Sequence, residues 1–93
     1  MMVKYRPQPT GKYKRDVKML KKRGYDLTPL KEVVSMLSRG VKLPPKYCDH
    51  PLKGNRKGYR DCHIQNDWIL IYKINKDILT LVLIETGTHS DLF

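Results

Sequence analysis

The first regular pattern in the chain is an apolar stripe in residues 12–23. Tyr13, Val17 and Leu20 recur at i, i+4 and i+7, the spacing that places side chains on one face of an α-helix. Most of the other positions in this segment are Lys or Arg, and Gly24 is a suitable residue to end a helix. The pattern predicts a helix with one apolar face and one strongly basic face.

A second apolar stripe follows after a short polar link. Its members are Leu30, Val33, Val34 and Leu37. Thr28 is expected to be the N-cap, because Pro29 is well tolerated at the first helical position, and Gly40 can end the helix. The short link predicts that the two helices form a helical hairpin.

The rest of the chain is patterned for β-structure. Segments rich in β-branched and aromatic residues, separated by turn residues, occupy residues 59–65, 68–74 and 78–84. Residues 41–57 are loop-like, and residues 5–9 supply at most a short edge strand, because they contain two prolines. The order predicts one α+β domain over residues 1–93, with the helical hairpin packed on a small, mostly antiparallel sheet.

Alternation along the first of these strands predicts which side chains face away from the helices. Tyr59, Asp61 and His63 fall on one side of the strand, whereas Arg60, Cys62 and Ile64 fall on the other. We expect the set with His63 to face the open side of the sheet and the set with Cys62 to face the helices. Whether Asp67, just beyond the turn, shares the face of His63 depends on the loop register, which the pattern does not fix.

Charge changes this picture by indicating a polyanionic partner. The formal net charge is +10, and residues 1–60 carry 17 Lys or Arg against 4 acids, a net charge of +13. Such a field attracts nucleic acid without specifying its sequence. A merely solvated, solubilising surface is the alternative.

The chain shows no sign of a membrane partner or an oxidising compartment. No apolar run approaches the roughly 20 residues of a membrane span, and the polar, basic N-terminus does not resemble a signal peptide. Cys48 and Cys62 are too few for a disulfide framework. We therefore expect a cytoplasmic protein.

Candidate chemistry is concentrated in the last 44 residues, which contain all three histidines, His50, His63 and His89. An imidazole takes and gives protons near neutral pH, so two such groups can cleave RNA without a metal. One removes the proton of a 2′-hydroxyl that attacks the neighbouring phosphorus, and the other protonates the leaving 5′-oxygen. Nearby cations, which include Lys53, Arg56, Lys57 and Arg60, suit a phosphate-rich substrate.

Metal binding and a nucleophilic cysteine are weaker alternatives. The histidines, Asp67 and the two cysteines form an adequate ligand inventory, but their spacing matches no compact zinc pattern. Neither cysteine lies at an obvious strand–helix elbow or helix N-terminus. We expect no metal and no cofactor.

Four segments resemble one family closely. They are Asp-His-Pro-Leu-Lys-Gly, Lys-Gly-Tyr-Arg-Asp-Cys-His, Asn-Asp-Trp-Ile-Leu-Ile-Tyr-Lys and Thr-Gly-Thr-His-Ser-Asp-Leu-Phe, in register over residues 49–93. They resemble the YafQ family of bacterial toxins in the RelE/ParE superfamily, and the helical half matches more loosely. The resemblance implies a RelE-like fold and a ribosome-dependent endoribonuclease that cuts mRNA in the ribosomal A site and leaves a 2′,3′-cyclic phosphate. It also implies a DinJ/RelB-type antitoxin as partner, besides the 70S ribosome and mRNA.

Carried over by position, the resemblance assigns roles to particular residues. The catalytic set is His50, His63, Asp67 and His89. Trp68 and Phe93 correspond to the family's tryptophan and terminal aromatic residue, although Trp68 also suits a core and Phe93 suits stacking on a base. Together with Lys18, Lys21 and Lys22 of the first helix and the four cations above, they are the expected RNA- and ribosome-binding residues.

One position departs from the family pattern. The family commonly has an arginine just before Thr-Gly-Thr-His that helps to hold the scissile phosphate, whereas this chain has Glu85. The reversal predicts either reduced activity or a substitute cation, Arg56 or Arg60; alternatively, Glu85 only ends an exposed strand.

Three functions compete with a ribosome-dependent endoribonuclease. They are a catalytically weakened toxin, a gyrase-directed ParE-like toxin and a basic RNA-binding module.

Overall fold

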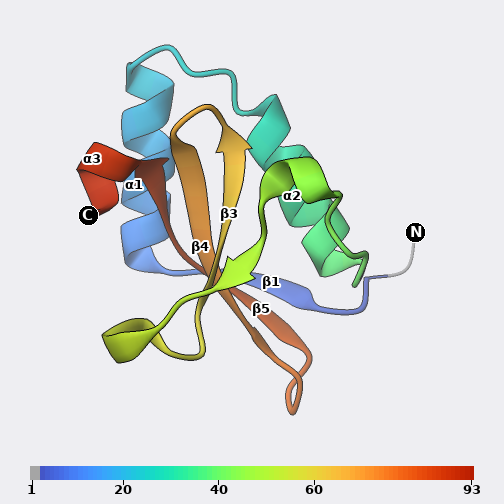
Figure 1. The fold of residues 1–93 in the computed structure, drawn as a ribbon. Helices are drawn as coiled ribbons and strands as arrows, with labels where there is room; N and C mark the ends of the chain where they lie inside the picture. Colours follow the sequence, from blue (N-terminus) through green and yellow to red (C-terminus); the bar gives the residue numbers. More distant parts are fainter. Residues whose placement is uncertain (1–2) are drawn as a thin grey trace.

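The computed structural model describes residues 3–93 as a five-stranded sheet with three α-helices and two 3-10 turns (Figure 1). In chain order the elements are β1 (Arg6–Pro9), α1 (Gly11–Lys22), α2 (Thr28–Ser38), η1 (Pro45–Tyr47), β2 (His50–Pro51), η2 (Gly54–Arg56), β3 (Arg60–Gln65), β4 (Trp68–Asn75), β5 (Thr80–Thr88) and α3 (His89–Leu92). The α+β class and the order of helices and strands agree with the sequence prediction.

The sheet has the strand order β1-β5-β4-β3-β2. β1 runs parallel to β5 at one edge, and the other three pairings are antiparallel. β2 lies within the segment expected to be a loop, and β5 extends to Thr88, beyond the predicted end at residue 84. Both differences matter, because they add His50 and Glu85 to the sheet.

The helices begin and end through local hydrogen bonds. Thr10 caps α1 by accepting a hydrogen bond from the Tyr13 backbone, and Gly24, with φ of 87°, follows its end as predicted. The predicted N-cap of α2 is wrong by one position. Thr28 is the first helical residue, and its backbone N–H donates to the carboxylate of Asp26 instead.

The core lies between the sheet and the pair α1 and α2. Buried side chains from both helices join those of the facing strand positions in one cluster, including Leu20, Val33, Cys62, Leu70 and Leu81. Burial of this apolar surface is the main stabilising contribution. The helical stripes and the placement of Cys62 toward the helices are therefore confirmed.

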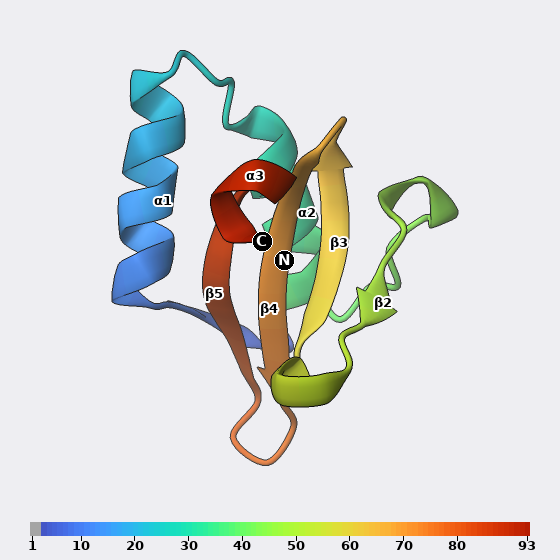
Figure 2. The same ribbon diagram turned by 60° about the vertical axis from the view of Figure 1, so that its left-hand side comes forward.

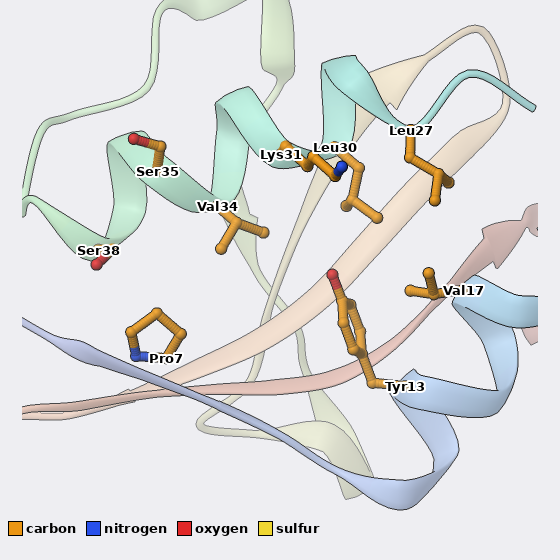
Figure 3. Close-up of a pocket in the computed structure, with 9 residues that line it drawn as sticks. All are labelled: Pro7, Tyr13, Val17, Leu27, Leu30, Lys31, Val34, Ser35 and Ser38. Atoms are coloured by element: carbon orange, nitrogen blue, oxygen red, sulfur yellow. The ribbon is translucent and has the colours of Figure 1, made fainter.

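An apolar pocket of about 320 Å³ lies between the two helices, at the margin of this core (Figure 3). Figure 3 shows Tyr13 extending from α1 toward Leu30 of α2. Burial raises the pKa of the Tyr13 hydroxyl to about 12. None of the histidines lines this pocket, so it is separate from the candidate chemistry.

The opposite side of the sheet has a different cover. Figure 2 shows α3 in front of β4, whereas α2 lies behind the sheet. The side chains of Ile69 and Ile71 on this face are fully buried although no long helix packs on them. Within residues 3–93, no helix is long and apolar enough to cross a membrane.

Candidate functional site

Strand pairing places two rows of residues across the face opposite α1 and α2. The first row contains His50 of β2, Asp61 of β3, Ile71 of β4 and Glu85 of β5. The second row contains His63 of β3, Ile69 of β4 and Gly87 of β5. Because directly paired residues lie on the same side of a sheet, both rows belong to one surface. The predicted open face of β3 is therefore confirmed for Asp61 and His63.

A β-bulge explains why Glu85 belongs to this surface. The register shifts so that Tyr72 pairs with Leu83 and Ile71 pairs with Glu85, leaving Ile84 as an extra residue. Strict alternation from Leu83, which is buried on the helical side, would place Glu85 on that side as well. The extra residue turns Glu85 toward the histidines instead.

α3 holds His89 above the second row. Gly87 permits the close approach, since a Cβ there would lie 3.1 Å from the Cβ of Asp91. The Asp91 carboxylate accepts a hydrogen bond from the Thr88 backbone at 3.0 Å, and the Thr88 hydroxyl accepts one from the Asp91 backbone at 3.3 Å. This capping box fixes the start of the helix at His89.

An ion pair ties α3 to the end of α1. Nη1 of Arg23 lies 2.9 Å from Oδ2 of Asp91. The Arg23 hydrogen bond, together with the Thr88 backbone, lowers the pKa of Asp91 from 3.8 to about 2. The carboxylate therefore remains ionised, and the helix anchored, throughout the neutral range.

Three rings follow one another on this surface. The centroids of His63 and His89 are 5.6 Å apart with their planes at 74°, and the ring of Phe93 lies 6.0 Å from that of His89. His63 is half-buried, whereas His89 and Phe93 are exposed. Two imidazoles that solvent can reach thus lie side by side, next to the exposed ring of Phe93.

Backbone carbonyls orient two of the three histidines. Nδ1 of His89 lies 3.1 Å from the carbonyl oxygen of Asp67, and Nδ1 of His50 lies 2.8 Å from that of Cys48. A carbonyl oxygen only accepts, so we assign the proton to Nδ1 in both rings. Nε2 is then the atom of each ring that remains available to exchange a proton with a substrate.

Asp61 is a site residue to which the sequence reasoning gave no role. It is 5% exposed, and within residues 3–93 its Oδ1 has no hydrogen-bond partner. The same oxygen lies 3.5 Å from Nδ1 of His50. A buried carboxylate with an unsatisfied oxygen is costly, and an adjacent imidazolium would offset that cost. The sequence pattern could have identified Asp61 as a site residue, because alternation placed it on the same side of the strand as His63.

Arg56 reaches this surface from η2. Its Nη1 lies 2.5 Å from Oε1 of Glu85, and the centre of its guanidinium lies 5.7 Å from the centroid of the Phe93 ring. Glu85 is 7% exposed, so the interpretation that it merely ends an exposed strand is wrong. Of the expected cations, Arg56 is the one that contacts Glu85 and Phe93 on the histidine side of the sheet.

Two expected RNA-binding residues lie elsewhere. Trp68 is 2% exposed, donates its indole N–H to the Thr86 hydroxyl and packs edge-on against Tyr25 in the core. The ring points toward the helices and belongs to the core, which is the alternative place that the sequence allowed for Trp68. Arg60 also projects from the helical side of β3, where its guanidinium binds the carboxylate of Asp49. It is separated from the histidines by the sheet.

The remaining expected residues are exposed. Lys18, Lys21 and Lys22 lie on α1, and Lys53 and Lys57 flank η2. The side chain of Asp67 is also exposed, and its backbone carbonyl, rather than its carboxylate, makes the contact with His89. Asp67 thus joins the site through a group that the sequence argument did not consider.

Neither alternative chemistry, a nucleophilic cysteine or a metal site, gains support on this surface. Cys62 is buried, and burial raises the pKa of its thiol far above the ordinary value, whereas Cys48 is exposed. In the part of the chain from residue 3 onward, no group of three or more His, Cys, Asp or Glu residues is arranged to hold a metal ion.

Comparison with known proteins identifies the family. A family model described as a bacterial toxin of type II toxin-antitoxin systems, YafQ, matches residues 5–93. The mRNA interferase toxin YafQ of Escherichia coli strain K12 is 46% identical over 85 residues, which are 90% of each chain. A crystal structure of YafQ from E. coli strain BL21(DE3) matches with a TM-score of 0.89 and 40% identity, over 96% of this chain and 98% of that one. The crystal structure of the E. coli DinJ-YafQ toxin-antitoxin complex matches with a TM-score of 0.88 and 42% identity, over 98% of this chain and 99% of that one. The chain, with its helical hairpin on a five-stranded sheet and its histidines on the opposite face, therefore belongs to the YafQ family of bacterial toxins.

Proposed function

We propose that this protein is an endoribonuclease that cleaves mRNA by attack of a 2′-hydroxyl on the adjacent phosphorus. The observation that carries the proposal is the pair His63 and His89, whose ring centroids are 5.6 Å apart on an accessible surface. The similarity of this protein to a relative named an mRNA interferase toxin supports the same activity.

The proposed reaction needs one proton acceptor and one proton donor. A neutral imidazole takes the 2′-hydroxyl proton as the 2′-oxygen bonds to phosphorus, and a protonated group gives a proton to the 5′-oxygen as its bond to phosphorus breaks. The products are a 2′,3′-cyclic phosphate and a 5′-hydroxyl. His89, whose Nδ1–H donates to the Asp67 carbonyl, would exchange a proton through Nε2, and His63, whose ring centroid is 5.6 Å away, would be the second group. Two such groups contribute roughly 10²–10⁴-fold each.

We further propose that cleavage occurs on the ribosome. The exposed lysines of α1, Lys18, Lys21 and Lys22, and those beside η2, Lys53 and Lys57, present cationic groups suited to ribosomal RNA phosphates. Phosphate contacts of this kind position a protein without reading sequence. Phe93, which is 65% exposed, would stack on an unpaired base of the mRNA.

The proposed regulatory partner is an antitoxin of the DinJ type. The relative with a TM-score of 0.88 was crystallised as a DinJ-YafQ complex, and this chain's +10 charge would attract an acidic, partly disordered segment. Because the ribosome is the proposed site of action, the proposed location is the cytoplasm.

Induced expression tests the proposed function. Wild-type protein should arrest growth and leave cleaved mRNA, whereas His89→Ala should do neither while folding normally. Growth arrest without cleaved mRNA would contradict the proposal and favour a non-nucleolytic toxin. A harmless wild-type protein that still binds RNA would favour a binding module.

A further inference from the structure

Glu85 is the least expected group on the histidine surface. It is a carboxylate on the face proposed to bind a phosphodiester, and it is almost fully buried there. A buried carboxylate without a partner is strongly unfavourable, because it loses its hydration. Its position therefore needs a compensating cation.

Two cationic side chains lie near Glu85, but only one of them forms a close ion pair with it. Arg56 contacts Oε1 at 2.5 Å, while Nζ of Lys12 lies 3.7 Å from Oε2. Lys12 is closer to Asp16, at 2.7 Å, so its charge is shared with that carboxylate. Arg56 is thus the principal partner of Glu85.

Arg56 keeps most of its hydrogen-bonding capacity in this pair. A guanidinium has five N–H donors, and among the side chains of residues 3–93 only Glu85 accepts a hydrogen bond from it. The side chain of Arg56 is 36% exposed, whereas that of Glu85 is 9% exposed. An anion that approaches from solvent therefore meets the donors before it meets the carboxylate.

The guanidinium is connected to the histidines through the ring of Phe93. It lies over the ring of Phe93, which neighbours His89, which in turn neighbours His63. Stacking on the ring and bonding to Glu85 restrain the guanidinium from two sides, which lowers the entropy lost when it binds a ligand. These contacts form one continuous strip that runs from Glu85 to His63.

We propose that Arg56 binds the non-bridging oxygens of the RNA phosphodiester beside His63 and His89, and that Glu85 is a positioning residue which holds the guanidinium there. The inference rests on the proposed nuclease function and gives its phosphate-binding group. Of the two outcomes that the sequence predicted for Glu85, reduced activity or a substitute cation, it favours the substitute cation and identifies it as Arg56. The phosphate-binding cation, which the family pattern places at the position of Glu85 in β5, is then supplied by Arg56 in η2.

The first test measures phosphate binding without chemistry. A short single-stranded oligonucleotide of 2′-deoxynucleotides lacks the attacking hydroxyl, so titration of the His63 and His89 ring signals by NMR reports binding alone. Arg56→Gln should weaken binding at least about tenfold, because the phosphate loses a charge-assisted hydrogen bond. Lys76→Gln removes an equal charge from the distant β4–β5 turn and should leave binding almost unchanged.

The second test separates positioning from simple charge. In single-turnover cleavage on programmed ribosomes, Arg56→Gln should slow the chemical step about 100-fold, as expected for loss of a group that stabilises the transition state. Glu85→Gln and Glu85→Arg should also lower the rate, although both make the protein more positive. The exchange Arg56→Glu/Glu85→Arg restores an opposite-charge pair and should cleave faster than Arg56→Glu alone.

The outcomes are distinguishable. If Arg56→Gln and Glu85→Gln behave like Lys76→Gln in both tests, the inference is wrong while the nuclease function stands. A rate increase in Glu85→Arg would contradict the positioning role of Glu85. If wild-type protein cleaves no mRNA, the proposed function fails, and the NMR titration still decides whether Arg56 binds phosphate.

Discussion

The two faces of the sheet are built from the same three central strands but by different interactions. On the helical face, α1 and α2 cover side chains such as Leu70 and Trp68, and the contacts are mainly apolar. On the other face, the short α3 and the η2 turn are fixed by ion pairs and caps, namely Arg56–Glu85 and Arg23–Asp91. The apolar helical face supplies most of the stability, so the other face can carry exposed polar groups, among them the proposed acid–base histidines.

The largest expected effect on stability belongs to the helical face. Trp68→Ala should lower the free energy of unfolding by about 3–5 kcal/mol, because it removes a buried indole and leaves Thr86 without its donor. Chemical denaturation of this variant beside His63→Ala measures the difference between the faces. A near-wild-type stability for Trp68→Ala would contradict the division of labour.

A large effect on rate with little effect on stability belongs to the histidine face. His63→Ala and His50→Ala should each slow cleavage at least tenfold, as expected for acid–base or phosphate-orienting groups. Asp61→Asn should slow it by a smaller factor, because Asp61 faces Nδ1 of His50 and touches no substrate. Unchanged cleavage rates in all three variants would contradict the assignment of catalytic roles to His50 and His63.

The anchoring of α3 gives a pH prediction. The pKa of Asp91 is lowered from 3.8 to about 2, so the Arg23 contact stabilises the folded state above pH 4 and is lost as the pH falls through about 2. An NMR titration of the Asp91 carboxyl should therefore have its midpoint near 2 in wild type and closer to 3.8 in Arg23→Ala. Asp91→Ala should reduce cleavage about tenfold by loosening His89, with Ser90→Ala, an exposed neighbour, as control. Equal midpoints in wild type and Arg23→Ala would contradict the proposed anchor.

The lysines of α1 lie outside the histidine site and are expected to affect ribosome binding rather than chemistry. Replacing Lys18, Lys21 and Lys22 by Glu should weaken binding and reduce its salt dependence, because fewer counterions are displaced. The rate of cleavage once bound should change little. Binding that does not depend on salt would count against the basic face of α1 as a docking surface.

The smallest expected effect concerns the cysteines. The buried Cys62, whose pKa is raised by desolvation, should resist thiol reagents at pH 8, whereas the exposed Cys48 should react. Titration of native protein should therefore detect one thiol, and titration of denatured protein should detect two. Two reactive thiols in native protein would show that the helical face opens readily.

The sequence predicts the helical face better than the histidine face. A stripe such as Tyr13 and Val17 identifies a buried helix surface by itself, because periodicity and burial have the same cause. The other face depends on contacts such as Arg23–Asp91, between residues 68 positions apart. It also depends on the bulge at Ile84, which reverses the alternation for Glu85. Periodicity contains neither kind of information, so β2, the full length of β5 and the burial of Glu85 were not predicted.

The resemblance to a family assigned the histidines to one catalytic set but did not separate core residues from site residues. It grouped Trp68 with the RNA-binding residues, whereas the pairing of β4 with β5 turns that ring toward the helices. His63 and Asp61, in contrast, followed the alternation of β3 as expected. Residues in regular strands were thus predictable, and residues beside bulges and turns were not.

The ends of the cleaved RNA test the central claim most directly. The claim is that the face opposite α1 and α2 cleaves mRNA through the 2′-hydroxyl, with His63 and His89 as its centre. On programmed ribosomes, wild-type protein should give fragments ending in a 2′,3′-cyclic phosphate and beginning with a 5′-hydroxyl, and His89→Ala should give at least about 100-fold less product. Fragments with a 3′-hydroxyl and a 5′-phosphate, or undiminished cleavage by folded His89→Ala, would contradict it.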